Sequence, residues 1–282
     1  MRRAYVITKP GNVHPKLTAS IAALGCPEPS VSEVDLRGAN ARDLIQDGHI
    51  SSGAYLALIH GRCSDFGIPS PAGVGCYLSH LQICRQICAL PAGSLALVLE
   101  ADCVLDVPLL EAAISSVEQS ITLSHADPHL VLFGSEPLQG CAAGASELCD
   151  IMATTSRPIP GTDTELRTTL PGAVSSRTHC CLYTVAGAAF VLRELGSKPV
   201  DVQWDSALSV LSVLSTGSRF LWWCPKGASQ SLHLSSIQDI CVKCMMKGAL
   251  PAVLFVGLLL LALLLGVLIA SRHCYQQPRV CG

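Results

Sequence analysis

Hydrophobic residues recur along the chain with two different periods, and these predict strands and helices in alternation. Short runs of apolar and β-branched residues predict strands at 5–8, 31–36, 95–99, 129–133, 180–184 and 220–224. Apolar residues spaced three and four apart predict helices at 14–24, 75–88, 106–119, 186–195 and 202–214. Strands interleaved with helices in this way indicate an α/β fold.

Three regions give a less regular pattern. The run 55–59 is a further strand candidate. Residues 135–178 are rich in Gly, Ser, Thr and Pro and have little periodicity, so a long loop is expected there, and irregular segments of this length are often binding loops. A polar loop is also expected at 226–248.

The helix predicted at 75–88 has an inward and an outward face. Its apolar stripe consists of Tyr77, Leu81, Cys84 and Cys88. His80 lies beside this stripe and is expected to point toward the sheet, whereas Ser79 falls on the opposite, polar face. Two interpretations of His80 stay open: a core histidine that bonds a backbone carbonyl, or a functional group.

Two carboxylates follow the strand predicted at 95–99. Glu100 and Asp102 are separated by one residue, Ala101, so on an extended backbone they project to the same side. Paired oxygen ligands suit a hard divalent cation. The carboxyl end of a strand is also where ligands bind in open α/β sheets. The pattern therefore predicts a metal site at Glu100 and Asp102.

A long apolar segment near the C-terminus predicts a membrane anchor. Residues 249–270 contain no charge, and as a helix they would span roughly 33 Å, enough to cross a bilayer. The first residues lack the apolar core of a secretory signal. Basic residues are balanced on either side of the segment, which leaves its orientation open. We expect a single-pass protein with a globular head at 1–240, a linker at 241–248, a span at 249–270 and a tail at 271–282.

Composition removes some functional classes. The net charge of −2 and the absence of a basic run argue against a nucleic-acid partner. The 15 cysteines are odd in number, and their spacing does not indicate a disulfide framework. The CxxC pair Cys241 and Cys244 has no second pair for zinc. Its place before the span favours acylation of Cys241, Cys244 or Cys274.

Several blocks resemble glycosyltransferase family 25, which includes lipopolysaccharide glycosyltransferases and procollagen galactosyltransferases. The segments GCYLSH at 75–80 and LVLEAD at 97–102 are similar to two blocks of that family. Further similar blocks follow in the same order, at 130–134, 178–179, 199–201 and 230–237. The resemblance extends over about residues 4–237.

The resemblance implies a GT-A-like fold with a mixed, mostly parallel sheet, a nucleotide-sugar donor and a divalent metal, Mn²⁺ or Mg²⁺. By this resemblance Asp102 would hold the metal with Glu100 near it. Inverting transfer, general in this family, needs a base for the acceptor hydroxyl. Asp201 matches a family acidic position and is the candidate base, and the alternative is an N-cap of the helix that follows.

The remaining site residues also follow from the resemblance. In the GCYLSH block, Ser79 is a candidate for donor binding and His80 for catalysis. His179 and His233 are candidates for contacts with phosphate or metal. The family's first strand is normally followed by an arginine, whereas this chain has none between its first strand and Arg37. Lys9 or Lys16 is therefore the candidate for binding the donor's charge, and the alternative is a solvated surface lysine.

The sequence thus predicts a membrane-anchored, metal-assisted hexosyltransferase that moves a hexose, galactose or glucose, from a nucleotide-sugar donor to a hydroxyl of a glycan or a protein. The expected acceptor is a glycan or a glycoprotein. A rival hypothesis stays open. Ala101 stands where the family usually has a further acid, and the arginine is missing. Both departures favour a catalytically inactive relative that serves as a binding module at a membrane.

Overall fold

The computed structural model describes residues 1–61, 67–123, 129–134, 136–137, 153–169, 175–176, 178–214 and 221–230. The chain separates into two units, Met1–Asp239 and Ile240–Gly282, and every described residue lies in the first. The expected linker, span and tail at 241–282 lie outside the described residues. Within the described part of the chain, no helix is both long and apolar enough to cross a membrane.

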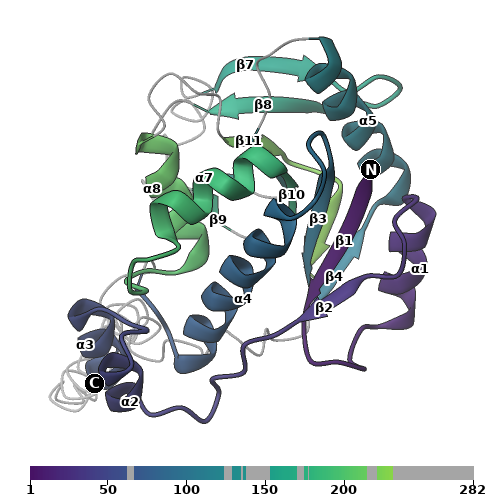
Figure 1. The fold of residues 1–282 in the computed structure, drawn as a ribbon. Coiled ribbons are helices and arrows are strands. Elements are labelled where there is room, and N and C mark those ends of the chain that lie inside the picture. Colours follow the sequence, from purple (N-terminus) through teal and green to yellow (C-terminus); the bar gives the residue numbers. More distant parts are fainter. Residues whose placement is uncertain are drawn as a thin grey trace, which may run out of the picture. The chain divides into compact units, whose positions relative to one another are not determined.

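One large sheet organises the first unit (Figure 1). Its strand order is β2-β1-β3-β10-β5-β11-β8-β7. Two short pairs, β4 with β12 and β6 with β9, lie outside it. The strands of the large sheet are β1 (Arg2–Ile7), β2 (Ser30–Ser32), β3 (Leu95–Glu100), β5 (Leu130–Phe133), β7 (Ala153–Pro158), β8 (Glu165–Thr169), β10 (Cys180–Thr184) and β11 (Leu221–Cys224). The short strands are β4 (Cys103–Leu105), β6 (Glu136–Pro137), β9 (Ser175–Ser176) and β12 (Ala228–Gln230).

Strand directions make this sheet mixed but mostly parallel. β1 pairs in parallel with β2 and β3, and β11 with β5, whereas β10 runs antiparallel between β3 and β5. β8 is antiparallel to both β11 and β7. Only β10 and β8 therefore oppose the common direction among the described strands. This confirms the predicted α/β class with a mixed, mostly parallel sheet.

Helices cover both faces of the sheet (Figure 1). One apolar core joins the sheet to α4, α7 and α8, and a second joins its other face to α1 and α5. The short helices α2 and α3 contribute Leu44 and Ala54 to the first core. The helices are α1 (Pro15–Ala23), α2 (Ala41–Gln46), α3 (Ser52–His60), α4 (Pro71–Cys88), α5 (Val107–Leu123), α7 (Val185–Leu195) and α8 (Trp204–Leu214).

The period of two along β3 decides where Glu100 points. Ala96 and Val98 belong to the core beneath α4. The alternate residues of the strand, Leu95, Leu97 and Leu99, belong to the core beneath α1 and α5. Glu100 continues the first series, so it faces α4 and α8. The inward histidine predicted on the helix is therefore on the same side of the sheet as Glu100.

Most predicted elements are confirmed, but β2, α3 and the start of α4 are corrections. The strand predicted at 31–36 is limited to Ser30–Ser32, where β2 pairs with β1. The run 55–59 is helical, because Ser51 caps the preceding turn and its side chain accepts a hydrogen bond from the Ala54 amide. Helix α4 begins at Pro71 rather than residue 75, since Ser70 caps it and proline suits the first helical position. Asp106 caps α5 as predicted, and its Oδ1 accepts from the Leu109 amide at 3.2 Å.

Part of the region expected to be loop is strand. β7 and β8 form an antiparallel pair between 153 and 169, and Gly161 turns between them with a φ of 77°. The β-branched threonines of both strands favour extended backbone, which outweighs the lack of a clean apolar period. β12 likewise lies in the expected loop 226–248 because it pairs with β4. Residues 138–152 and 231–248 lie outside the described residues.

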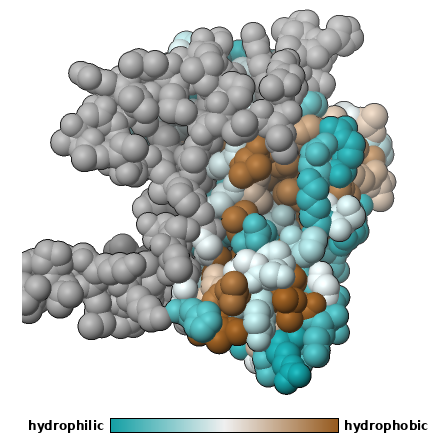
Figure 2. All heavy atoms as spheres, turned by 90° about the vertical axis from the view of Figure 1, so that its left-hand side faces the viewer, coloured by the Kyte–Doolittle hydropathy of each residue, from teal (hydrophilic) through white to brown (hydrophobic). Residues whose placement is uncertain are grey.

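Apolar side chains also reach the surface of α3 and α8. Leu56 and Ile59 on α3 and Val210 on α8 are each about half exposed. Figure 2 looks onto this side and shows apolar groups separated by polar ones over the described part of the face. Such mixing is ordinary for a protein surface.

Candidate functional site

The candidate site lies where the carboxyl ends of the parallel strands meet the start of β10. Because β10 runs the other way, His179 just before it lies beside the end of β3, and the Glu100 amide donates to the His179 carbonyl at 3.0 Å. Gly134 follows β5 with a φ of 65°, and a Cβ there would lie 2.9 Å from His179 Nε2. The ends of β3 and β5 are thus packed closely around His179, which is buried.

Helix α4 is fixed at this edge by Gly75 and Ser79. A Cβ on Gly75 would lie 2.2 Å from the Val34 carbonyl oxygen, so only glycine permits this approach. One turn later, the Ser79 hydroxyl accepts from the Val34 amide and donates to the Gly75 carbonyl, both at 2.8 Å. Ser79 is fully buried, which corrects the expected polar face. The two residues set the rotation of α4.

That rotation directs Cys76 and His80 toward the end of β3. The two residues are four apart and therefore share one face of the helix. The ligand atoms of Cys76, His80 and Glu100 all lie within 4.8 Å of one another. The structure thus brings His80 and Glu100 together, as the pattern predicted, and adds a thiol.

The His80 ring is buried in apolar surroundings. Its ring stacks on the Trp204 indole with centroids 4.7 Å apart and planes 10° apart. Neither ring nitrogen has a hydrogen-bond partner among the described residues, so the backbone-carbonyl interpretation is not observed in that part of the chain. Burial lowers the pKa of His80 to about 3. The imidazole is therefore neutral at ordinary pH, with a lone pair available.

Glu100 lies near two other carboxylates, those of Asp102 and Asp205. Burial raises the pKa of Glu100 to about 8, and the nearby charges of Asp102 and Asp205 add to the effect. Burial also raises the pKa of the Cys76 thiol well above its usual range, and the negative charges of Glu100 and Asp205 add smaller effects in the same direction. At neutral pH the thiol and most of the Glu100 carboxyl are therefore protonated. A bound cation would reverse this.

Asp102 lies near Glu100 but is not one of the three ligand residues Cys76, His80 and Glu100. β3 ends at Glu100, so Asp102 lies in the turn after it and the period of two no longer determines its direction. Its Oδ2 accepts from Gln230 Nε2 at 3.4 Å, and its Oδ1 is buried with no hydrogen-bond partner in the described part of the chain. Burial raises the pKa of this carboxyl. The expected pair is thus divided between two neighbouring positions.

The other predicted site residues contact partners of their own. Asp201 is exposed and accepts a hydrogen bond from the Ser51 hydroxyl at the start of α3. Because α8 begins only at Trp204, Asp201 is not its N-cap. Lys9 forms an ion pair with Asp35 at 2.8 Å and is half exposed. The candidate His233 lies outside the described residues.

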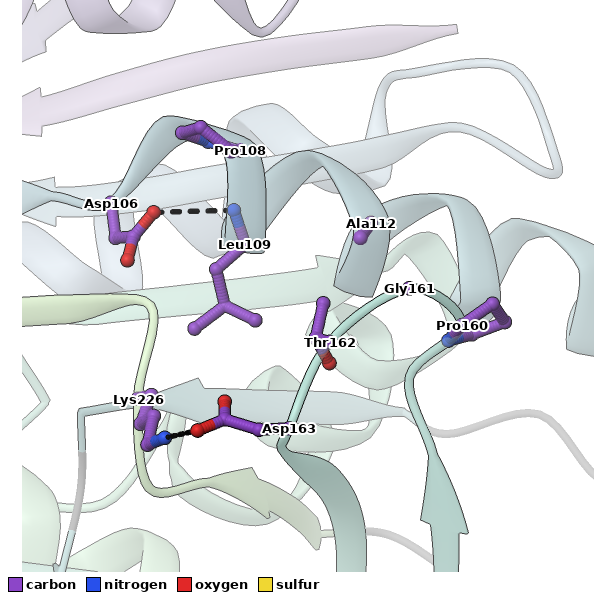
Figure 3. A pocket seen from close by; sticks show the side chains of 9 residues that line it. All are labelled: Asp106, Pro108, Leu109, Ala112, Pro160, Gly161, Thr162, Asp163 and Lys226. Atoms are coloured by element: carbon purple, nitrogen blue, oxygen red, sulfur yellow. Dashed lines mark hydrogen bonds and ion pairs between the residues drawn. The ribbon is translucent and has the colours of Figure 1, made fainter.

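A separate open pocket lies on the α5 side of the sheet (Figure 3). It has a volume of about 470 Å³ between the start of α5 and the turn that joins β7 to β8. Its two carboxylates are already engaged: Asp106 caps α5, and Asp163 pairs with Lys226 at 2.7 Å. The pocket therefore offers space but no unshared acidic group.

Sequence reasoning missed two members of the site, Cys76 and Asp205. Cys76 carries a readable signal, because it precedes His80 by four residues on a predicted helix. Asp205 has none, since only folding brings the first turn of α8 to the end of β3. Comparison of the chain with protein-family models and with curated proteins finds no match.

Proposed function

We propose that this protein is a glycosyltransferase that moves a hexose, galactose or glucose, from a nucleotide-sugar donor to a hydroxyl of a glycan or a protein. The observation that carries the proposal is the gathering of three carboxylates, Glu100, Asp102 and Asp205, at the carboxyl edge of a mostly parallel sheet. An edge of this kind is a common ligand site in α/β proteins. A GT-A-like arrangement agrees with the mixed sheet, and the resemblance of the GCYLSH and LVLEAD blocks supports the same class.

The acidic residues fit a divalent cation. Asp102 Oδ1 is buried without a hydrogen-bond partner among the described residues, which a ligand would relieve. Burial, and after it the charges of Asp102 and Asp205, raises the pKa of Glu100, and a bound cation would favour the ionised carboxylate. Asp102, with Glu100 near it, would hold Mn²⁺ or Mg²⁺, which supplies neutralisation of the charge that develops on the nucleotide diphosphate.

Four residues of the chain have proposed roles of their own. Asp201 accepts the proton of the acceptor hydroxyl, and the hydrogen bond from Ser51 orients its carboxylate for this role. Lys9, after the end of β1, binds the phosphates of the donor. Its ion pair with Asp35 would be replaced by an ion pair with these phosphates. Gln230 orients Asp102. The neutral His80 ring, stacked on Trp204 beside Glu100, shields the edge from water.

The test is hydrolysis or transfer by the full chain, assayed with a panel of nucleotide sugars and with Mn²⁺ or Mg²⁺. Turnover is expected to require the metal. Asp102→Asn should reduce it by at least about 100-fold, because a lost charged ligand costs several kcal/mol of transition-state stabilisation. The matched control is Asp163→Asn, an exposed acid at the other pocket, which should retain activity.

The rival, an inactive binding module, predicts a different result in the same assay. It predicts metal-dependent nucleotide binding without turnover of any donor. Absence of both turnover and metal-dependent nucleotide binding would refute the whole assignment.

We also propose that residues 249–270 anchor the protein in a membrane. Removal of residues 249–282 should release the chain from membranes into the soluble fraction, because the uncharged segment is lost. Retention of the shortened chain on membranes after a high-salt wash would contradict the anchor.

A further inference from the structure

We propose that Cys76, His80 and Glu100 form a second cation site, selective for a borderline transition metal, with Zn²⁺ as the best fit. Its three ligands come from α4 and β3. It assigns Glu100 to this cation and leaves Asp102 to the hard cation of the proposed transferase. It does not depend on that function.

The backbone already holds the three ligands together. Cys76 and His80 lie one helical turn apart on the face of α4 that meets the sheet, and Glu100 ends the strand opposite them. Their ligand atoms lie within 4.8 Å of one another. Ligands of tetrahedral zinc at 2.0–2.3 Å are about 3.3–3.8 Å apart, so side-chain movements of about 1 Å would complete the site.

The state of His80 is an independent sign of a ligand. Its side chain is 1% exposed, and both ring nitrogens are buried without a hydrogen-bond partner in the described part of the chain. A buried nitrogen with no partner is unfavourable. Stacking on Trp204 fixes the ring plane, so the ring is held ready rather than free to turn away. A metal bond to one nitrogen would use this lone pair.

The donor set determines the kind of cation. A thiolate, a neutral imidazole and a carboxylate together suit Zn²⁺, whereas Mg²⁺, Mn²⁺ and Ca²⁺ favour oxygen ligands alone. Cys76 and Glu100 would bind as anions after losing their protons to solvent, and their two negative charges would balance one divalent cation. Asp205 adds negative charge next to both anionic ligands. Three protein ligands leave a fourth position for Asp205 or water.

The thiol provides a specific spectroscopic test. The full chain is stripped of metal with a chelator and titrated with Co²⁺, which replaces Zn²⁺ in such sites and shows a thiolate-to-cobalt absorption band. We expect saturable binding, the band and its disappearance on addition of Zn²⁺. Because cysteines elsewhere in the chain can also bind cobalt, the band of wild type is compared with the bands of the Cys76→Ser and Cys88→Ser variants at the same cobalt concentration.

Matched variants separate a ligand from a structural thiol. The Cys76→Ser variant should lose the cobalt band of this site and bind Zn²⁺ at least about 100-fold more weakly. Even substitutions of residues that only contact a ligand reduce metal affinity about 10- to 100-fold. Cys88→Ser is the control, because this thiol lies on the same helix but outside the group. Zn²⁺ should raise the melting temperature of wild type and Cys88→Ser only.

Other outcomes would overturn the site. They are a Cys76→Ser protein that keeps the band, a Cys88→Ser protein that loses it, or no saturable cobalt binding by wild type. Should Cys76→Ser fail to fold by circular dichroism, Glu100→Gln replaces it, with the band retained and the affinity reduced. Asp102→Asn should keep the cobalt band while it loses turnover, so failure of this site and failure of the transferase are distinguishable.

Discussion

The Glu100→Gln substitution should make the protein less sensitive to alkaline pH when metal has been removed with a chelator. The Glu100 carboxyl has a pKa of about 8 in the folded chain, compared with an ordinary value of 4.5. Between these values the folded state holds a proton that the unfolded state has released. Stability is therefore fully present below about pH 4.5 and is lost as the pH rises through 8.

The size of this loss follows from the pKa difference. A difference of about 3.5 pH units corresponds to about 5 kcal/mol. Glu100 is only partly buried, so water reduces the effect, and we expect about 2–4 kcal/mol. Glutamine has the same shape and never ionises. The variant should match wild type near pH 5 and exceed its unfolding free energy by this amount near pH 9.

The assay is urea unfolding of the full chain at several pH values, with chelator present and tryptophan fluorescence as the probe. Glu118→Gln is a control of opposite sign, because a hydrogen bond from Arg2 lowers the pKa of Glu118. The Glu118→Gln variant should be less stable than wild type at neutral pH, and the two should have equal stability in acid. Parallel pH curves for wild type and Glu100→Gln would refute the raised pKa of Glu100, and with it the burial of this carboxyl beside Asp102 and Asp205. With saturating Zn²⁺ the order should reverse, since the variant lacks a ligand.

Three further substitutions test the positions of α4 and β1. Gly75→Ala should lower the unfolding free energy by about 1–3 kcal/mol and weaken Zn²⁺ binding, because the added Cβ would clash with the Val34 carbonyl oxygen. Gly38→Ala is the control in the same denaturation assay, since a Cβ at Gly38 would meet open space. Ser79→Ala should lose about 1–3 kcal/mol through two buried hydrogen bonds, and an unchanged unfolding midpoint would contradict that. Arg2→Met removes ion pairs to Glu111 and Glu118 and should lower the melting temperature, less so in high salt.

Much of the fold could be predicted because the strands at the centre of the sheet, β3, β5, β10 and β11, are buried on both faces. The strand 180–184 has the predicted bounds, and 129–133 and 220–224 are each one residue longer than β5 and β11. Apolar runs of this kind are ambiguous when short, which is why 55–59 was predicted as a strand. In the structure Ser51 caps a helix there, because its side chain accepts a hydrogen bond from the Ala54 amide. This bond depends on the backbone geometry, which the apolar pattern does not reveal.

The β7–β8 hairpin could not be predicted in the same way. Its partner is β11, more than fifty residues farther along the chain, and its own sequence shows no apolar alternation. Pairing at this separation is a tertiary event. Local propensity carries little information about it.

The site was predictable only where it follows a local period. Glu100 and His80 could be placed by counting residues along one strand and one helix. Asp102 could not, because the strand ends before it and a turn redirects the chain. Ser79 is predicted on the polar face because hydroxyls are usually exposed to solvent. In the structure it is buried, because its hydroxyl accepts a hydrogen bond from the Val34 amide, which lies far away in the sequence.

Helix α4 keeps the residues that fix its position separate from the residues that carry chemistry. Gly75 and Ser79 hold the backbone against Val34, and the next residue in each case, Cys76 or His80, faces the sheet edge. A substitution at 76 can therefore change cation preference, for instance toward harder metals with Asp, without changing how the helix docks. The ligand set is thus open to evolution or redesign independently of the stability of the fold.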